Sequence, residues 1–357
     1  MIKLSLRCAA KYNQFGSAYG YGRTYNSFVK YLSRRNDIKL VDSYLDADMQ
    51  VCMCYPHRRV EEFAWWGRRQ HRVQVIYTTW ETTVIPEDWA DVMNDSTAVF
   101  APSRWCCDVF RENGVKIPIY WTPNAADVEE FPFFERNWSG TECELWDGKK
   151  FVYLWQGMHP ADRKGMIYAQ RAFAELNLPD SWLMLKWYPV VSAPFGPIIY
   201  NSRRMTQVGR IFDRKLYMEL LSKCHVSVNP FRGESPGQMP METASTGMYT
   251  IATNWSGATD YLYPDFFWPL DYKLSKPGED YISMSPYNDI RYANPGKAQD
   301  AIPDIEDLKR AMLWAYENRE QAMAKGRLAS AFIQKEWNWD VAAGMMVKAC
   351  KKVMESV

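Results

Sequence analysis

The sequence predicts an α/β protein built from two doubly wound parallel-sheet (Rossmann-like) domains. Two observations lead to this fold class. Short apolar runs alternate with helical stretches along most of the chain, and 357 residues are enough to bury two separate hydrophobic cores. Strands that alternate with helices pair in parallel, and helices then cover both faces of the sheet. In such sheets ligands bind at the carboxyl ends of the strands.

The expected domain boundaries follow from changes in composition. We predict a first domain over residues 1–135, a polar linker over 136–150, a second domain over 151–334 and a C-terminal helix over 335–357. The linker contains Gly140 and Gly148, and the C-terminal helix carries Val341, Met345 and Ala349 four residues apart. The strands expected in the first domain are 2–6, 49–54, 73–78, 98–101 and 119–122.

Composition describes an ordinary globular protein. Hydrophobic residues make up 47% and charged residues 24%, which excludes disordered and fibrous classes. No apolar run approaches the roughly 20 residues of a membrane span, and no signal segment begins at Met1, so we expect a cytoplasmic protein. The eight cysteines lack a Cys-x-x-Cys spacing, and we therefore expect reduced, buried thiols without disulfides or zinc.

The segment 226–253 carries the most information about ligands. An apolar run at 226–231 predicts a buried strand, Pro240 suits the first turn of a helix, and Gly247 suits its C-terminal stop. A second strand is expected at 249–253. The free N–H groups of the loop and of the helix start favour an anion there.

Two glutamates, Glu234 and Glu242, stand eight positions apart in this segment. A carboxylate repels phosphate but accepts hydrogen bonds from hydroxyls, so the pattern indicates a ligand with both a phosphate and a sugar. Spacing alone would favour a solvated pair beside an ordinary turn, because such pairs are common. Two further segments, described next, favour a ligand site over a solvated pair.

A second segment supplies positive charge. A strand over 151–157 is followed by Arg163, Lys164 and Gly165, and then by a helix over 168–176. Cations in this place can hold the phosphate of such a ligand. Taken alone, the two basic residues would fit a solvated surface loop.

A third segment lies in the first half, where the strand 98–101 precedes Ser103 as a helix N-cap and Gly114 as the helix stop. In this order, the three segments resemble the retaining glycosyltransferases of the GT-B fold, in particular the GT4 family (glycosyl transferases group 1). They cover about half the chain. The opening strand and the Gly-rich loop at 15–23 extend the resemblance.

The resemblance implies that a sugar is transferred with retention from a nucleotide-diphosphate donor, UDP- or GDP-linked, bound in a cleft between the domains. It places Glu234 on the transferred sugar and Glu242 on the ribose, and it has the terminal helix cross back onto the first domain. The other expected donor-binding positions are Gly16, Ser17, Arg163, Lys164, Arg210, Phe212, Pro236, Gly237, Gln238 and Met239.

The chain departs from the family in two places. Met158 stands where the family usually has an arginine, and the stretch 76–83 lacks the usual histidine. Glu81 is our candidate for contacting the acceptor hydroxyl, and an exposed loop glutamate fits equally well. In the family the leaving phosphate is often proposed to deprotonate the acceptor, so no protein nucleophile is needed. The expected catalytic residues are Glu234, Lys164 and Glu81. Asp46 and Asp48 have the spacing of a metal-binding Asp-x-Asp motif, but they lead directly into a predicted strand. No metal or other cofactor is therefore expected.

The distribution of charge along the chain indicates which acceptors fit. Residues 1–75 hold 13 Lys and Arg against 6 Asp and Glu, a net charge of +7. Arginines between tryptophans can hold phosphates while aromatic faces stack on bases. The residues concerned, our expected acceptor-binding set, are Arg58, Arg59, Trp65, Arg68 and Arg69.

Several acceptors fit these residues. One is a hydroxymethylated pyrimidine base flipped out of DNA, as in bacteriophage DNA-glucosylating enzymes, which would act in the bacterial or phage-infected cytoplasm. Another is an envelope glycolipid or polysaccharide. Alternatively, Trp65 and Trp66 are core residues. A non-enzymatic alternative, a sugar-nucleotide-binding module that has lost activity, is supported only by Met158.

Overall fold

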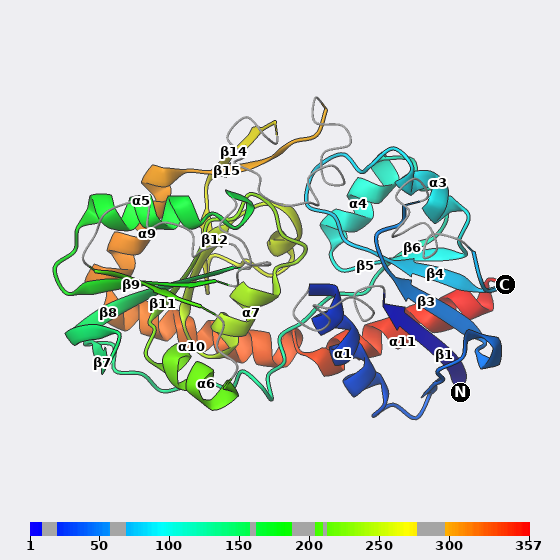
Figure 1. Ribbon diagram of the computed structural model, residues 1–357, viewed down its shortest axis with the longest axis horizontal. Helices are drawn as coiled ribbons and strands as arrows, with labels where there is room; N and C mark the ends of the chain where they lie inside the picture. Colours follow the sequence, from blue (N-terminus) through cyan, green and yellow to red (C-terminus); the bar gives the residue numbers. More distant parts are fainter. Residues whose placement is uncertain (9–19, 58–68, 158–161, 188–203, 210–212, 277–296) are drawn as a thin grey trace. The chain divides into compact units, whose positions relative to one another are not determined.

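The computed structural model describes residues 1–8, 20–57, 69–157, 162–187, 204–209, 213–276 and 297–357 (Figure 1). The chain divides into two compact units. Unit 1 comprises residues 1–125, 287–298 and 337–357, and unit 2 comprises residues 126–286 and 299–336. Each unit contains one large parallel sheet, which confirms the predicted α/β class.

The sheet of unit 1 has the strand order β2-β1-β3-β4-β5-β6, and every pairing is parallel. Five of its strands lie where the sequence predicts them. The sixth, β2, was not predicted, because it is three residues long and exposes Lys39 at its centre. The strands are β1 (Ile2–Cys8), β2 (Ile38–Leu40), β3 (Met49–Met53), β4 (Gln74–Tyr77), β5 (Ala98–Ala101) and β6 (Ile119–Trp121).

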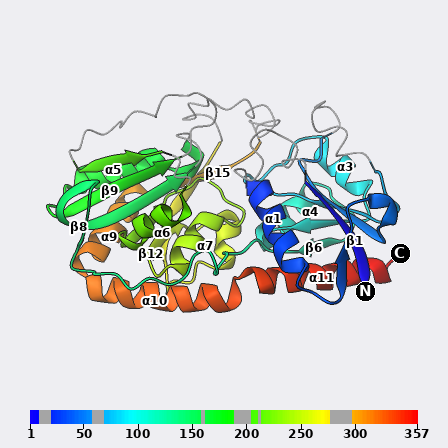
Figure 2. The same cartoon turned by 60° about the horizontal axis from the view of Figure 1, so that its bottom comes forward.

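Helices cover both faces of this sheet. The helices α1 (Gly20–Leu32) and α11 (Trp339–Glu355) lie side by side on one face (Figure 2), where Phe28 and Trp339 meet with ring centroids 4.9 Å apart. The helices α3 (Trp89–Asn94) and α4 (Arg104–Glu112) pack against the other face.

The predicted apolar stripe of the C-terminal helix is wrong by one residue at two positions. The side chains that enter the core of unit 1 are Ala342, Met346, Ala349 and Val353, whereas Met345 is only half-buried. The inward face follows spacings of three and four residues, so a stripe drawn at four alone drifts off it.

The sheet of unit 2 has the order β10-β9-β8-β11-β12-β13, again in parallel, with β7 added antiparallel to β8. The stretch 136–150, predicted as a linker, instead contains β7 and the start of β8. The Trp146 indole donates a hydrogen bond to the Thr141 carbonyl (2.9 Å) across this hairpin. The strands are β7 (Thr141–Cys143), β8 (Trp146–Gly157), β9 (Ser181–Trp187), β10 (Met205–Val208), β11 (Val226–Asn229), β12 (Tyr249–Thr253) and β13 (Trp268–Leu270).

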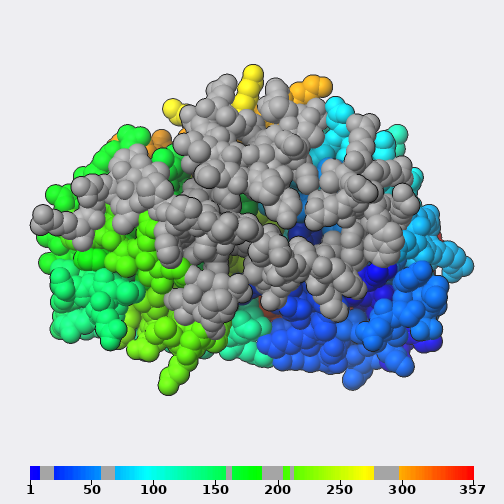
Figure 3. Space-filling model, in the orientation of Figure 1, coloured from blue at the N-terminus to red at the C-terminus, as the bar shows by residue number. Residues whose placement is uncertain are grey.

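Two helices, α5 (Met166–Leu176) and α9 (Ile305–Glu317), cover one face of this sheet, and α6 (Arg214–Ser222) covers the other (Figure 1). The outer side of α6 is exposed, as its light green atoms in Figure 3 show. The helix α7 (Gln238–Ser245) follows β11, and α10 (Arg319–Glu336) packs along α7. A short hairpin of β14 (Tyr272–Ser275) and β15 (Asp300–Pro303) completes the unit.

Close packing at Gly247 ends α7. Gly247 has φ +88°, the left-handed conformation expected of the residue that ends a helix. A Cβ at this position would lie 2.5 Å from the Phe133 ring. Next to it, a Cβ on Gly326 of α10 would lie 2.4 Å from the Gly247 carbonyl oxygen. Glycine at both positions lets α10 lie directly against the turn between α7 and β12.

Both sheets reverse their direction of winding at one place. In unit 2 the chain starts at β8, adds β9 and β10 on one side, and then returns to add β11 on the other. The loops that follow β8 and β11 therefore lie on the two sides of a topological switch point, where open α/β sheets bind ligands. In unit 1 the corresponding point lies between β1 and β3.

Among the described helices, none combines the length and hydropathy that crossing a bilayer requires. All eight cysteines are free thiols, and every one except Cys143 is buried.

Candidate functional site

The candidate site lies at the switch point of unit 2. The loop after β8 leads through the 3-10 helix η4 (Asp162–Lys164) into α5, and the loop after β11 leads through residues 230–237 into α7. Because β8 and β11 are neighbours in the sheet, these two loops meet above its carboxyl edge.

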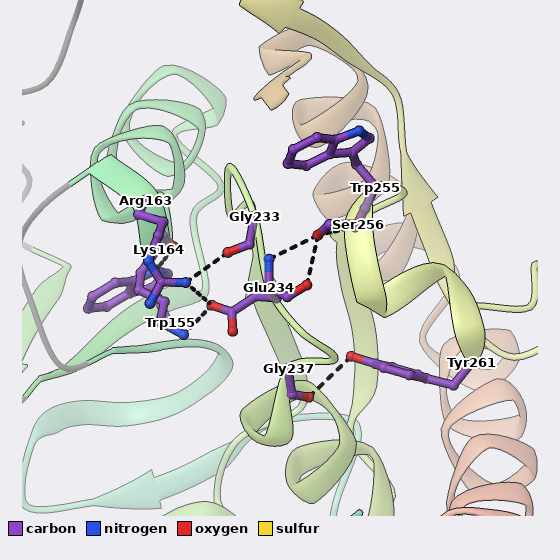
Figure 4. A network of polar contacts seen from close by, with 9 residues as sticks. All are labelled: Trp155, Arg163, Lys164, Gly233, Glu234, Gly237, Trp255, Ser256 and Tyr261. Carbon is purple, nitrogen blue, oxygen red and sulfur yellow. Dashed lines mark hydrogen bonds and ion pairs between the residues drawn. The ribbon is translucent and has the colours of Figure 1, made fainter. Parts of the chain in front are cut away.

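A charged network joins the two loops (Figure 4). The Glu234 carboxylate accepts a hydrogen bond from the Lys164 ammonium and a second, of 3.3 Å, from the Arg163 guanidinium. The side chains of Glu234, Lys164 and Arg163 are only 10%, 15% and 19% exposed. Charges removed from water in this way interact more strongly than surface pairs. The structure thus brings together three of the residues that the sequence predicts.

Backbone contacts fix the spacing of the loops. The Arg163 guanidinium also donates to the Gly233 carbonyl (2.8 Å), and the Arg232 N–H donates to the Arg163 carbonyl (2.8 Å). Gly165 has φ +72°, and a Cβ there would lie 1.8 Å from the Pro230 carbonyl oxygen. Only glycine permits this approach.

The other side of Glu234 is held by a residue that sequence reasoning missed. The Ser256 hydroxyl accepts from the Glu234 N–H (2.9 Å) and donates to the Glu234 carbonyl (2.8 Å), which also accepts from the Gly257 N–H (2.9 Å). Ser256 begins the 3-10 helix η5 (Ser256–Asp260) just after β12, the neighbour of β11. Its place after the next strand is the only signal in the sequence that could have found it.

A buried ion pair, also missed from the sequence, supports the same loop. The Arg232 guanidinium contacts the Asp300 carboxylate at 2.7 Å, and both side chains are buried. The Ala301 N–H donates to the Arg232 carbonyl (2.9 Å), so β15 is tied to the residue two positions before Glu234.

The start of α7 lies beside Glu234. Gly237 is its N-cap residue with φ +92°, and its carbonyl accepts a hydrogen bond of 3.3 Å from the Tyr261 hydroxyl. Gln238 and Met239 open the helix and are half-buried, and Pro236 is buried. The free N–H groups and the dipole of this helix start favour an anion in front of it.

Glu242 lies on α7 and is 2% exposed, while Glu234 as a whole residue is 7% exposed. The alternative of a solvated glutamate pair is therefore wrong. A carboxylate is buried only where partners compensate its charge, which is typical of a functional or structural network.

The remaining predicted residues fall elsewhere. Glu81 belongs to unit 1, half-exposed in the loop after β4. The Arg69 guanidinium donates to the carbonyls of His71, Arg72 and Asp95, contacts that favour a structural role. The other predicted positions lie outside the described residues: Gly16, Ser17, Arg58, Arg59, Trp65, Trp66, Arg68, Met158, Arg210 and Phe212.

In the part of the chain that the structure describes, no three His, Cys, Asp or Glu side chains converge, so no candidate metal site is present there. Asp46 lies in the 3-10 helix η3 (Tyr44–Asp46), and the Asp48 carboxylate accepts the Lys3 N–H (2.8 Å). Asp48 therefore ties the start of β3 to β1.

No protein-family model and no curated protein sequence matches the chain. Solved structures do. Sucrose-phosphate synthase from Thermosynechococcus elongatus matches with a TM-score of 0.68 and 13% identity over 100% of both chains. A glycosyltransferase from Rickettsia africae matches with a TM-score of 0.67 and 12% identity over 100% of this chain and 99% of its own. HepE from Anabaena, in complex with UDP and glucose, matches with a TM-score of 0.66 and 11% identity over 99% of this chain and 100% of its own. At these identities the likeness establishes the fold, and the chain has the GT-B fold that the sequence predicts.

Proposed function

We propose that this protein is a retaining, GT4-like glycosyltransferase that moves a sugar from a nucleotide-diphosphate donor to a hydroxyl group. The observation that carries the proposal is the contact of Glu234 with Lys164 and Arg163 at the switch point of unit 2. The fold shared with several glycosyltransferases, one of them in complex with UDP and glucose, supports it.

Each residue has a role that follows from its chemistry. Lys164 and Arg163 hold the diphosphate and neutralise the charge that develops on it as the sugar leaves. The N–H groups at the start of α7, around Gln238 and Met239, add to this anion site. Glu242 binds the ribose hydroxyls.

Glu234 selects the sugar. A diphosphate competes with Glu234 for Lys164 and Arg163, and its arrival leaves the carboxylate oxygens to accept hydrogen bonds from the sugar hydroxyls. The leaving phosphate takes the proton of the acceptor hydroxyl on the same face of the sugar, which accounts for retention without a protein nucleophile. Glu81 is proposed to contact the acceptor.

The acceptor proposal has two forms. A hydroxymethylated pyrimidine in DNA rests on Arg58, Arg59, Trp65 and Arg68 in the basic first 75 residues. Arg69 adds little to it, because backbone carbonyls already engage its guanidinium. The other form is an envelope glycolipid or polysaccharide.

A donor screen tests the proposal. The full chain is incubated with UDP-, GDP- and ADP-sugars, with and without hydroxymethylcytosine DNA, and both nucleotide release and mass added to DNA are measured. We expect nucleotide release by the native protein and none by Glu234→Ala. The control Glu219→Ala, an exposed glutamate on α6 of the same unit, keeps the native rate.

The outcomes separate the alternatives. Sugar on the DNA identifies the base as the acceptor, whereas slow donor hydrolysis without labelled DNA favours a lipid or glycan. Nucleotide binding without turnover would favour the inactive binding module. Unchanged transfer by Glu234→Ala would contradict the site.

A further inference from the structure

A buried tyrosine, Tyr261, lies next to the start of α7. It follows directly on the 3-10 helix η5 and is 0% exposed. Its ring packs edge to face against Phe267, with the ring centroids 5.9 Å apart and the ring planes at 78°. Its N–H donates to the Ala258 carbonyl (3.1 Å), so the backbone and the ring are both held. The tyrosine hydroxyl therefore has a rigid support.

This hydroxyl contacts the residue from which α7 starts. It donates a hydrogen bond of 3.3 Å to the Gly237 carbonyl, as Figure 4 shows. Burial raises the pKa of the Tyr261 phenol well above its usual range, and Glu234 and Asp260 raise it further, so the hydroxyl keeps its proton and donates. A Cβ on Gly237 would lie 3.3 Å from the hydroxyl oxygen and 3.4 Å from the Glu234 Cβ, so the three residues fit closely together.

The contact also determines where the next N–H group points. The Gly237 carbonyl and the Gln238 N–H belong to one peptide unit, which is planar and trans, so the two groups point in opposite directions. A hydroxyl that fixes the carbonyl therefore fixes the N–H as well. Since the carbonyl is directed at Tyr261, the Gln238 N–H is directed away from it, out of the amino end of α7.

The first turn of α7 has few N–H groups to offer. Pro240 carries none, so of the first three helical residues only Gln238 and Met239 can donate. First-turn N–H groups have no acceptor within their own helix, and Gly237 at the N-cap has no side chain that could accept from them. With two donors in place of three, the direction of each one matters more to an anion in front of the helix.

One short helix holds both ends of the loop 234–237. Ser256, where η5 begins, bonds to the N–H and the carbonyl of Glu234, and Tyr261, just after η5 ends, bonds to the carbonyl of Gly237. The carboxylate assigned to the sugar and the N–H group assigned to the diphosphate are therefore set by the same element.

We propose that Tyr261 is a positioning residue for the donor: its hydroxyl orients the Gly237–Gln238 peptide so that the Gln238 N–H meets the diphosphate. This inference rests on the proposed function and adds to it a residue that does not itself touch the ligand. The phenol is fully buried, so it acts only through the peptide that it holds.

Titration calorimetry of the full chain with inorganic pyrophosphate, UDP, GDP and ADP tests the inference. Tyr261→Phe keeps the ring and removes the hydroxyl, and we expect it to weaken pyrophosphate binding about 2- to 10-fold, the factor of one neutral hydrogen bond. Tyr153→Phe is the matched control. It removes another fully buried hydroxyl of unit 2, which donates to the Met312 carbonyl (2.8 Å), and it should keep the native affinity.

A double-mutant cycle tests whether Tyr261 acts through the N–H group. Gln238→Pro removes that N–H, and proline is well tolerated at the first position of a helix. In this background Tyr261→Phe should cause no further loss of pyrophosphate affinity. Gln238→Ala keeps the N–H and removes only the side chain, so in that background Tyr261→Phe should have its full effect.

The contrary outcomes are distinct. A folded Tyr261→Phe variant, as judged by circular dichroism, that binds pyrophosphate with native affinity would overturn the inference and leave the proposed function standing. An equal loss from Tyr153→Phe, or equal losses from Tyr261→Phe in the two Gln238 backgrounds, would do the same. If Gln238→Pro does not fold, the comparison with Tyr153→Phe decides. If the native protein binds neither pyrophosphate nor any of the three nucleotide diphosphates, the proposed function falls and this inference falls with it.

Discussion

Each unit contains a parallel sheet whose winding reverses once, but the strand orders differ, and so does the chemistry of the loops beyond the strands. In unit 2 the loops after β8 and β11 bring Lys164, Arg163 and Glu234 together. In unit 1 the loop after β1 lies outside the described residues, and the residues just beyond β4 make a neutral network, in which the Tyr21 hydroxyl contacts the Thr78 hydroxyl at 2.9 Å and accepts from the Thr79 N–H (3.1 Å). The winding of a sheet therefore determines where a site can lie, and the loop residues determine its chemistry.

The largest test of this difference breaks the support of the charged site. Asp300→Ala leaves the Arg232 guanidinium buried without its carboxylate, and we expect it to lower the free energy of unfolding by about 3–5 kcal/mol. Urea unfolding measures this. The matched variant in unit 1 is Asp37→Ala, whose exposed pair with Lys351 should contribute only about 0–1 kcal/mol.

A double variant separates charge from packing at the same place. Arg232→Met with Asp300→Leu replaces the buried pair with apolar groups and should recover most of the lost stability. If Asp300→Ala destabilises the protein no more than Asp37→Ala does, the pair does not support the Glu234 loop.

The second test removes one cation of the site. Lys164→Met should lower kcat about 10²- to 10³-fold, since one preorganised group that stabilises developing charge contributes that much. Lys39→Met, on the exposed edge strand of unit 1, is the control and should keep the native rate. Steady-state kinetics with the preferred donor distinguish the two, and equal rates would show that Lys164 does not contact the leaving group.

A buried histidine in each unit extends the comparison to pH. Burial lowers the pKa of His225 in unit 2 to about 4, with Arg136 and Arg319 adding repulsion. Its Nδ1 accepts the Val152 N–H (2.9 Å) and its Nε2 donates to the Asn137 carbonyl (2.9 Å), so the folded protein has no place for a second proton. Burial also lowers the pKa of His57 in unit 1, but the Asp88 carboxylate at 3.0 Å opposes that shift.

The sign of the pH effect follows from these lowered values. The unfolded histidine, with a pKa near 6.5, binds a proton more readily than the folded one, so acid favours unfolding. The contribution of His225 is complete above about pH 6.5 and is lost as pH falls towards about 4, a total of about 3 kcal/mol. Urea unfolding at pH 7.5 and pH 4.5 measures it. His225→Gln should flatten the dependence more than His57→Gln does, and equal slopes would contradict the role of Asp88.

The sequence was sufficient for those features that depend on neighbouring residues. Strand positions, the helix start at Ser103 and the stop at Gly247 follow from local patterns, and all are present in the structure. Glu234 and Lys164 were found because each follows a predicted strand. Parallel pairing then brings them together.

Features that depend on distant contacts were not predictable. Ser256 lies 22 positions from Glu234, and Asp300 lies 68 positions from Arg232, so no local pattern relates the partners. The hairpin at 141–150 was mistaken for a linker, because its polar residues face solvent. It also pairs β7 with the first residues of β8, a strand that the sequence pattern predicts to begin only at residue 151.

The smallest test sharpens the comparison with two serines. Ser256→Ala removes the acceptor of the Glu234 N–H, while the Glu234 carbonyl keeps the Gly257 N–H, so the expected loss of stability is about 1–3 kcal/mol. Ser103→Ala in unit 1 removes an N-cap hydroxyl that accepts from the Cys106 N–H (3.1 Å) and should lose a similar amount, about 0.5–2 kcal/mol. Only Ser256→Ala should also lower kcat, because only Ser256 positions Glu234, the residue proposed to contact the sugar. If both variants lose stability and neither loses activity, the hydroxyl of Ser256 stabilises the fold without positioning Glu234.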